Sequence, residues 1–189
     1  MFEGVSLAMG PGEAALLRGP NGIGKSSLLR LLAGFLPPAD GTLHWAGADI
    51  AEDIGLYRTQ LHYVGHLDGV KPVLSVRENV RLYAQLLGNP QDEDQALDHF
   101  GLLSLADLPA RYLSAGQRRR LNLARLAAAN RPLWLLDEPT VSLDAESVAQ
   151  LEALIERHLN NGGMAIIATH LDMQINNARI LTLGTEGIT

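Results

Sequence analysis

The sequence contains no cysteine among its 189 residues. This absence excludes a disulfide scaffold, a zinc or iron–sulfur site with cysteine ligands, a cysteine nucleophile and the paired cysteines of haem attachment. It is consistent with a reducing compartment such as the cytosol.

An excess of basic charge and long apolar runs are also lacking. The chain has 15 Lys and Arg residues against 21 Asp and Glu residues, which gives a formal net charge of −6. This acidic balance argues against a protein that holds nucleic acid through a basic surface. No apolar stretch approaches the roughly 18 residues of a membrane-spanning helix. A role at a membrane would therefore require a membrane-embedded partner.

The composition that remains is typical of a folded globular chain. Hydrophobic residues make up 47% and charged residues 19% of the sequence. The length suits one well-buried domain with room for a small lobe, and it is too short for two full domains.

Short apolar segments alternate with helical patterns, which predicts an α/β fold with a mostly parallel sheet. Strands are expected at 14–18, 61–64, 133–137, 164–169 and 180–183, and helices at 27–32, 115–129 and 144–159. Residues 42–45 predict a small antiparallel β element. The stretch from about 70 to 112 contains two helical patterns, 75–87 and 94–100, and no convincing strand. We interpret it as a helical lobe inserted into the α/β core.

A glycine-rich loop follows the first expected strand. Gly19 to Ser26 fits the pattern G-x-x-x-x-G-K-[ST], in which tightly turned backbone N–H groups converge on a phosphate at a helix start. Lys25 is expected to reach the β- and γ-phosphates, and the Ser26 hydroxyl to ligate Mg²⁺. The residues expected to bind ATP are Gly19, Pro20, Asn21, Gly22, Ile23, Gly24, Lys25, Ser26 and Ser27.

Two later apolar strands end in polar residues suited to the same chemistry. Asp137 and Glu138 follow one of them, and His170 follows another. We expect Asp137 to hold Mg²⁺ through water and Glu138 to polarise an attacking water molecule. Strand ends face the ligand crevice in open parallel sheets, so His170 could contact the γ-phosphate or Glu138.

A second candidate phosphate-binding helix start lies at Leu113–Gln117, where Ser114 is a good N-cap. One nucleotide can use both helix starts only if the fold, or a second copy of it, brings them together. An ordinary helix cap explains this segment equally well.

The order of these segments resembles the nucleotide-binding subunits of ABC transporters over essentially the whole chain. The matching motifs are Walker A at Gly19–Ser26, the signature at Leu113–Gln117, Walker B at Leu133–Glu138, the D-loop at Ser142–Asp144 and the switch histidine at His170. Ala115 replaces the more usual glycine of the signature.

The resemblance implies an ABC-ATPase fold of the P-loop NTPase class, with residues 1–189 forming a single ATP-binding domain that hydrolyses ATP with Mg²⁺. It also implies a head-to-tail dimer in which one copy caps the ATP held by the other. The capping residues would be Ser114, Ala115, Gly116 and Gln117, and Asp144 would belong to the D-loop.

A narrower resemblance connects the chain to the ATP-binding subunits of haem exporters in cytochrome c maturation. Tyr63–Lys71, Leu74–Asn79 and Arg131–Pro139 carry it, and His66 stands where most of the family has glutamine in the coupling loop. It implies membrane permease partners and a peripheral position on the cytoplasmic face of a bacterial inner membrane. Direct haem binding is not expected.

The start of the chain departs from the family pattern. Only 18 residues precede Gly19, and Phe2 is the only aromatic residue among them. Family members usually begin further upstream, with a strand and an aromatic residue that stacks on adenine. We expect both features to be missing, through truncation or a late assigned start.

Several alternatives remain at this stage. The transporter could serve another cargo, or the chain could be a soluble ABC-type ATPase acting on nucleic acid or the ribosome, although such proteins usually carry two cassettes or a coiled-coil insertion. A P-loop small-molecule kinase would give Ser114 no role. Arg118, Arg119 and Arg120 occupy consecutive helical positions, so they are expected to form a solvated helix face rather than a nucleic-acid patch.

Overall fold

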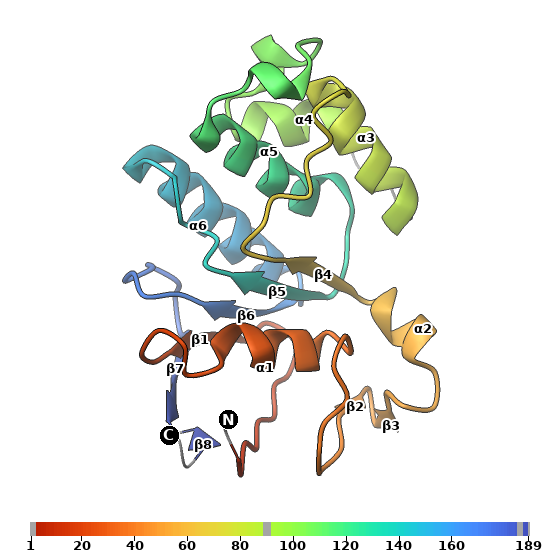
Figure 1. Ribbon diagram of the computed structural model, residues 1–189, viewed down its shortest axis with the longest axis vertical. Coiled ribbons are helices and arrows are strands. Elements are labelled where there is room, and N and C mark those ends of the chain that lie inside the picture. The colour runs from red at the N-terminus through yellow and green to blue at the C-terminus, as the bar shows by residue number, and fades with distance from the viewer. Residues whose placement is uncertain (1–2, 89–91, 185–186, 189) are drawn as a thin grey trace. The chain divides into compact units, whose positions relative to one another are not determined.

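Two units make up the computed structural model, which describes residues 3–88, 92–184 and 187–188 (Figure 1). The first unit comprises Met1–Gly65, Arg131–Pro139 and Arg157–Thr189, and the second comprises His66–Asn130 and Thr140–Glu156. Phe2, the candidate aromatic near the start of the chain, lies outside the described residues.

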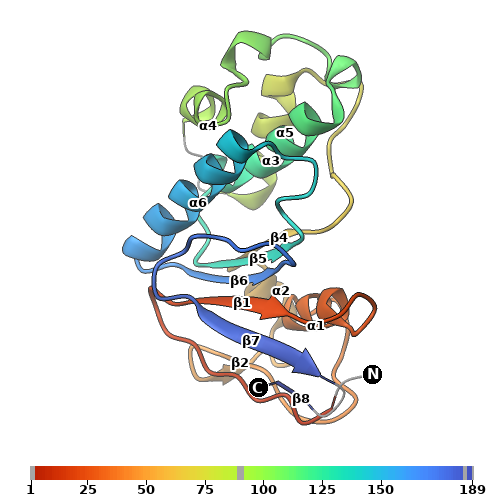
Figure 2. The same ribbon diagram turned by 90° about the vertical axis from the view of Figure 1, so that its left-hand side faces the viewer.

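A six-stranded sheet in the order β4-β5-β6-β1-β7-β8 is the centre of the first unit (Figure 2). Its strands are β1 (Ala14–Arg18), β4 (Leu61–Val64), β5 (Leu133–Asp137), β6 (Met164–Ala168), β7 (Arg179–Gly184) and β8 (Gly187–Ile188). Neighbouring strands from β4 to β7 run parallel, and β8 pairs antiparallel with β7. The expectation of a mostly parallel sheet is confirmed.

The sequence of these strands explains their position. All five residues of β5 are buried, as are the last four of β6, because both strands lie inside the sheet. Helix α1 (Lys25–Leu32) adds Leu28 and Leu29 to the same core. Burial of each such leucine side chain contributes about 1.5–3 kcal/mol.

A second, two-stranded sheet lies in the first unit, where the sequence predicts a small antiparallel element. Strands β2 (His44–Trp45) and β3 (Ala48–Asp49) pair antiparallel. Ala46 and Gly47 join them with positive φ angles of 50° and 86°, as a tight hairpin turn requires. The short helix α2 (Ile54–Arg58), which the strand and helix patterns do not predict, follows the N-cap Asp53.

The second unit is helical. Its elements are α3 (Val76–Leu87), α4 (Glu93–His99), the 3-10 turns η1 (Leu103–Leu105) and η2 (Ala110–Tyr112), α5 (Ala115–Ala128) and the larger part of α6 (Ala145–Asn160). Ser75 and Glu78 form the capping box that the sequence predicts for α3. Among the described residues, no helix combines the length and apolar character needed to cross a membrane.

Helix α5 corrects one sequence expectation. Arg118–Arg120 do not form a solvated face: Arg119 is only 3% exposed and forms an ion pair with Asp68. Arg118 donates to the Leu113 carbonyl and Arg120 to the Phe100 carbonyl. A charge run cannot reveal partners that lie far away in the sequence, so the prediction was wrong.

Candidate functional site

The loop between β1 and α1 has the backbone geometry of a phosphate cradle. Gly19, Gly22 and Gly24 all have positive φ angles, of 145°, 80° and 116°, a region that favours glycine. A Cβ atom on Gly19 would lie 2.7 Å from the Leu183 carbonyl oxygen. Gly24 is the N-cap of α1 and has no side chain to cap the first-turn N–H groups. The helix start can therefore offer these donors to an anion.

Lys25 is the first residue of α1 and is buried. Its Nζ donates to the carbonyl oxygens of Gly19 (2.7 Å) and Pro20 (3.2 Å). The ammonium group of Lys25 thus lies against the glycine-rich loop between β1 and α1. A phosphate bound in this loop would provide an anionic partner for it.

Ser26 and Asp137 are 111 residues apart in the sequence and meet in the structure. The Ser26 hydroxyl donates to Asp137 Oδ1 over 3.0 Å. Asp137 is 2% exposed because it ends the buried strand β5. A hydroxyl and a carboxylate are the oxygen donors that Mg²⁺ accepts beside a nucleotide, so the two residues fit such an ion.

Glu138 and His170 form a second contact, at the carboxyl ends of β5 and β6. The His170 Nδ1 atom lies 2.8 Å from Glu138 Oε2. Glu138 has a φ angle of 47°, which is uncommon for a residue with a side chain, and its N–H donates to the Ala168 carbonyl (2.8 Å). This backbone hydrogen bond to β6 holds Glu138 in a strained backbone conformation. Strained residues of this kind cluster at functional sites.

The signature residues lie in the second unit, at the start of α5. Ser114 Oγ accepts the Gln117 N–H (3.2 Å), and Gln117 Oε1 accepts the Ser114 N–H (2.8 Å). Ala115 is exposed. A Cβ atom on Gly116 would lie 3.1 Å from the Ser142 carbonyl oxygen, so the small residue permits a close approach of the D-loop.

Asp144 lies directly before α6, and its side chain accepts a hydrogen bond from the first turn of that helix. Its Oδ1 accepts the Ser147 N–H (2.8 Å), and hydrogen bonds from Ser147 lower the pKa of the Asp144 carboxyl group. His66 is exposed in the loop after β4. The contacts within each unit therefore place Gly19–Ser27, Asp137, Glu138 and His170 in the first unit, and His66, Ser114–Gln117 and Asp144 in the second.

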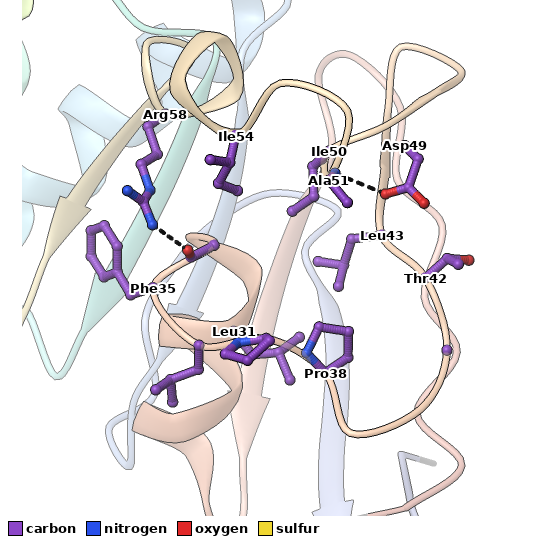
Figure 3. A pocket seen from close by; sticks show the side chains of 14 residues that line it. Leu31, Phe35, Pro38, Thr42, Leu43, Asp49, Ile50, Ala51, Ile54 and Arg58 are labelled. Atoms are coloured by element: carbon purple, nitrogen blue, oxygen red, sulfur yellow. Dashed lines mark hydrogen bonds between the residues drawn. The ribbon is translucent and has the colours of Figure 1, made fainter.

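A pocket in the first unit was not predicted. It has a volume of about 370 Å³, and its lining includes the apolar residues Leu31, Phe35, Leu43 and Ile54 (Figure 3). Arg58 lies at one side, where its Nη2 donates to the Gly34 carbonyl (2.6 Å). None of the residues expected to bind ATP line this pocket. The apolar run Phe35–Pro38 is the only signal in the sequence that could have indicated it.

Comparison with known proteins identifies the family. A family model described as "ABC transporter" matches residues 2–141. The chain is 54% identical over 184 residues to the cytochrome c biogenesis ATP-binding export protein CcmA of Rhodospirillum rubrum. This alignment covers 97% of this chain and 79% of that protein. It is 50% identical to the protein of the same name from Paramagnetospirillum magneticum, with 97% and 87% covered.

The fold agrees with this match. The dimeric structure of a bacterial ABC transporter cassette aligns with a TM-score of 0.83 at 25% identity, covering 99% of this chain and 88% of that one. The ABC-ATPase fold expected from the motifs is therefore present, with its parallel sheet, small antiparallel sheet and helices. The chain belongs to the ABC transporter family, as one of its ATP-binding, ATP-hydrolysing subunits.

Proposed function

We propose that two copies of this chain hydrolyse ATP to power an ABC transporter that exports haem for cytochrome c maturation. The observation that carries the proposal is the meeting of Ser26 with Asp137, and of Glu138 with His170, beside a glycine-rich cradle. The assignment to export in cytochrome c biogenesis is supported by the names of the relatives from Rhodospirillum rubrum and Paramagnetospirillum magneticum.

Nucleotide binding would use the first unit. The backbone N–H groups of Gly19–Ser27 would hold the β- and γ-phosphates, and Lys25 would add a positive charge. Ser26 would ligate Mg²⁺ directly and Asp137 would hold it through water. When bound, the ion neutralises charge on the phosphates and on the leaving group.

Hydrolysis would depend on Glu138. Its carboxylate orients a water molecule and accepts a proton as the water oxygen bonds to the γ-phosphorus and the bond to the β–γ bridging oxygen breaks. His170 holds the carboxylate through the 2.8 Å contact and restricts its rotation. ADP and inorganic phosphate are the products.

The remaining partners follow from the family. Ser114–Gln117 of one copy would cap the ATP bound by the other, an arrangement supported by the dimeric form of the related cassette. Membrane permease subunits of the cytochrome c maturation system would hold the dimer on the cytoplasmic face of a bacterial inner membrane. Domain movement in the dimer would carry the energy to them. Contact with haem or nucleic acid is not expected.

The proposal is tested by purifying the tagged chain from membranes of its own host and measuring hydrolysis of Mg²⁺-ATP. We expect recovery with cytochrome c maturation membrane proteins and an ATPase activity that the Glu138→Gln variant lacks. Recovery only with an unrelated permease would replace the haem assignment by another cargo. A complex that contains these membrane proteins but releases no phosphate would refute the ATPase role.

A further inference from the structure

An exposed aromatic ring lies next to the signature residues in the second unit. Tyr112 is 62% exposed, ends the 3-10 turn η2 and stands two residues before Ser114, the N-cap of α5. A ring in water forgoes the stabilisation that burial against apolar or aromatic groups would give it. The surface of Tyr112 is therefore available to a ligand that meets this end of α5.

The backbone around Tyr112 is held in place from both sides. Its N–H donates to the Pro109 carbonyl (3.1 Å), and the N–H of Leu113 donates to the Ala110 carbonyl (3.2 Å). The Leu113 carbonyl accepts a hydrogen bond from Arg118 Nη1 (2.6 Å), and the Leu113 side chain is buried. The ring thus projects from a fixed backbone, so a ligand that binds it has to order little more than two side-chain torsions.

Tyr112 and Ser114 face the same side of the chain. Leu113 and Ser114 both have extended backbone, with ψ angles of 144° and 168°, and side chains of an extended segment alternate between two sides. Burial follows this alternation, because Leu113 is buried whereas Tyr112 and Ser114 are exposed. Two residues of extended chain span about 7 Å. This span is comparable with the length of a triphosphate chain.

The guanidinium group of Arg111 adds a cation to the ring. It lies 4.8 Å from the centre of the Tyr112 ring, and its Nη2 donates to the Tyr112 hydroxyl (3.0 Å). With the cation over one face, the opposite face can stack on a planar group. Proteins that bind single-stranded nucleic acid stack bases on such rings, because every base has a π face. A purine joined to a polyanion therefore suits both parts of this pair.

We infer that Tyr112 of one copy stacks on the adenine base of the ATP held by the other copy. Ser114 caps the phosphates of that nucleotide while Tyr112 contacts its base, so the second copy recognises both ends of the ligand. The inference deepens the proposed function and rests on it, because both require ATP at the interface between two copies. It gives the base a part in dimer closure, since a triphosphate without a base would be held by the capping residues alone.

The first test compares hydrolysis of Mg²⁺-ATP by complexes that contain the wild-type chain, Tyr112→Ala, Tyr112→Phe or the control Leu86→Ala. Leu86 is an apolar residue of the same unit that is 71% exposed. We expect Tyr112→Ala to raise KM for ATP about tenfold, the effect of losing one stacked base, with kcat changed less than about twofold. Tyr112→Phe keeps the ring and should match the wild type, as should Leu86→Ala.

A fluorescent base analogue separates stacking on the base from packing against the partner copy. The probe is 2-aminopurine riboside triphosphate, whose emission is quenched when the base stacks, bound to a saturating excess of the Glu138→Gln chain. We expect the quenching to be lost when Tyr112→Ala is added to this chain and kept with Tyr112→Phe.

Two results would overturn the inference and leave the ATPase role intact. One is an unchanged KM for Tyr112→Ala, and the other is equal probe emission from the chains with and without the Tyr112 ring. A wild-type complex that releases no phosphate would instead count against the proposed function.

Discussion

The two units hold a helix start by opposite means. In the first, α1 begins at Gly24 without a side-chain cap, and the sheet beneath it fixes the neighbouring groups. In the second, α5 begins at Ser114 inside a closed capping box, and buried polar side chains fix the helix. Geometry built from strand pairing depends on the backbone, whereas geometry built from buried polar contacts depends on individual side chains.

This difference has an energetic consequence. Substitution of a functional side chain in the first unit removes chemistry but leaves the strand register unchanged. Substitution of a buried polar side chain such as Asn79 in the second unit removes several hydrogen bonds at once, which costs about 1–3 kcal/mol. The first unit should therefore separate activity from stability, and the buried polar contacts of the second should not.

Glu138→Gln gives the largest expected effect and the sharpest test of the first unit. Loss of the carboxylate should slow hydrolysis by about 10²-fold or more, while ATP affinity and thermal stability stay near wild type. Single-turnover hydrolysis and an unfolding curve measure the two quantities. Glu52→Gln, an exposed carboxylate of the same unit, is the control. Near-normal turnover would remove Glu138 from its proposed role.

Lys25→Ala should act on binding. A charge-assisted hydrogen bond of about 1.5–3 kcal/mol corresponds to an affinity for ATP lower by about tenfold to a hundredfold. Equilibrium titration with ATP provides the measurement, and Arg30→Ala is the matched control because Arg30 is an exposed cation on the same helix. Unchanged affinity would contradict the assignment of the cradle.

Asn79→Ala should show the opposite behaviour in the second unit. The side chain accepts from Lys71 N–H and donates to the carbonyls of Lys71, Leu74 and Ser75. Its loss should lower the free energy of unfolding by about 1–3 kcal/mol without a change in ATP affinity. Denaturant titration measures the effect against Gln85→Ala, an exposed amide of the same helix. A variant of wild-type stability would erase the contrast between the units.

His158 provides the smallest effect, through pH. Its ring stacks on Trp134 (3.8 Å between centroids, 5° between planes), and burial lowers the pKa of His158 below its ordinary 6.5. Below pH 6.5 the unfolded chain therefore binds a proton that the folded chain does not, so the free energy of unfolding falls as pH decreases. Denaturant titrations at several pH values should show a shallower slope for His158→Phe and no change for the exposed His44→Gln. Equal slopes for wild type and His158→Phe would refute the assignment.

Local signals in the sequence predicted much of the fold. The start of α3 was predicted because Ser75 and Glu78 are only three residues apart. Strands β1, β4 and β5 are short, mostly apolar segments, and their bounds are the predicted ones. Helix α2 was missed because it has only five residues, too few for a periodic pattern.

Long-range polar contacts were beyond prediction. Asp68 and Arg119 are 51 residues apart, and no sequence motif indicates that they form an ion pair. The proximity of Ser26 and Asp137 was inferred only because a shared Mg²⁺ role implies it. Residues that bind one ligand together can be recognised because their motifs follow one another in a known order along the sequence. A structural ion pair leaves no such pattern in the sequence.

The capping box of α5 bears on how the dimer would close. A hydroxyl group has one hydrogen to give and two lone pairs to receive, and the Gln117 N–H occupies a lone pair of Ser114. The hydrogen of Ser114 can then point outward without disturbing the cap. Docking against a second copy would therefore require no unwinding at this end of the helix, and the two halves could separate and rejoin each cycle with this surface already shaped.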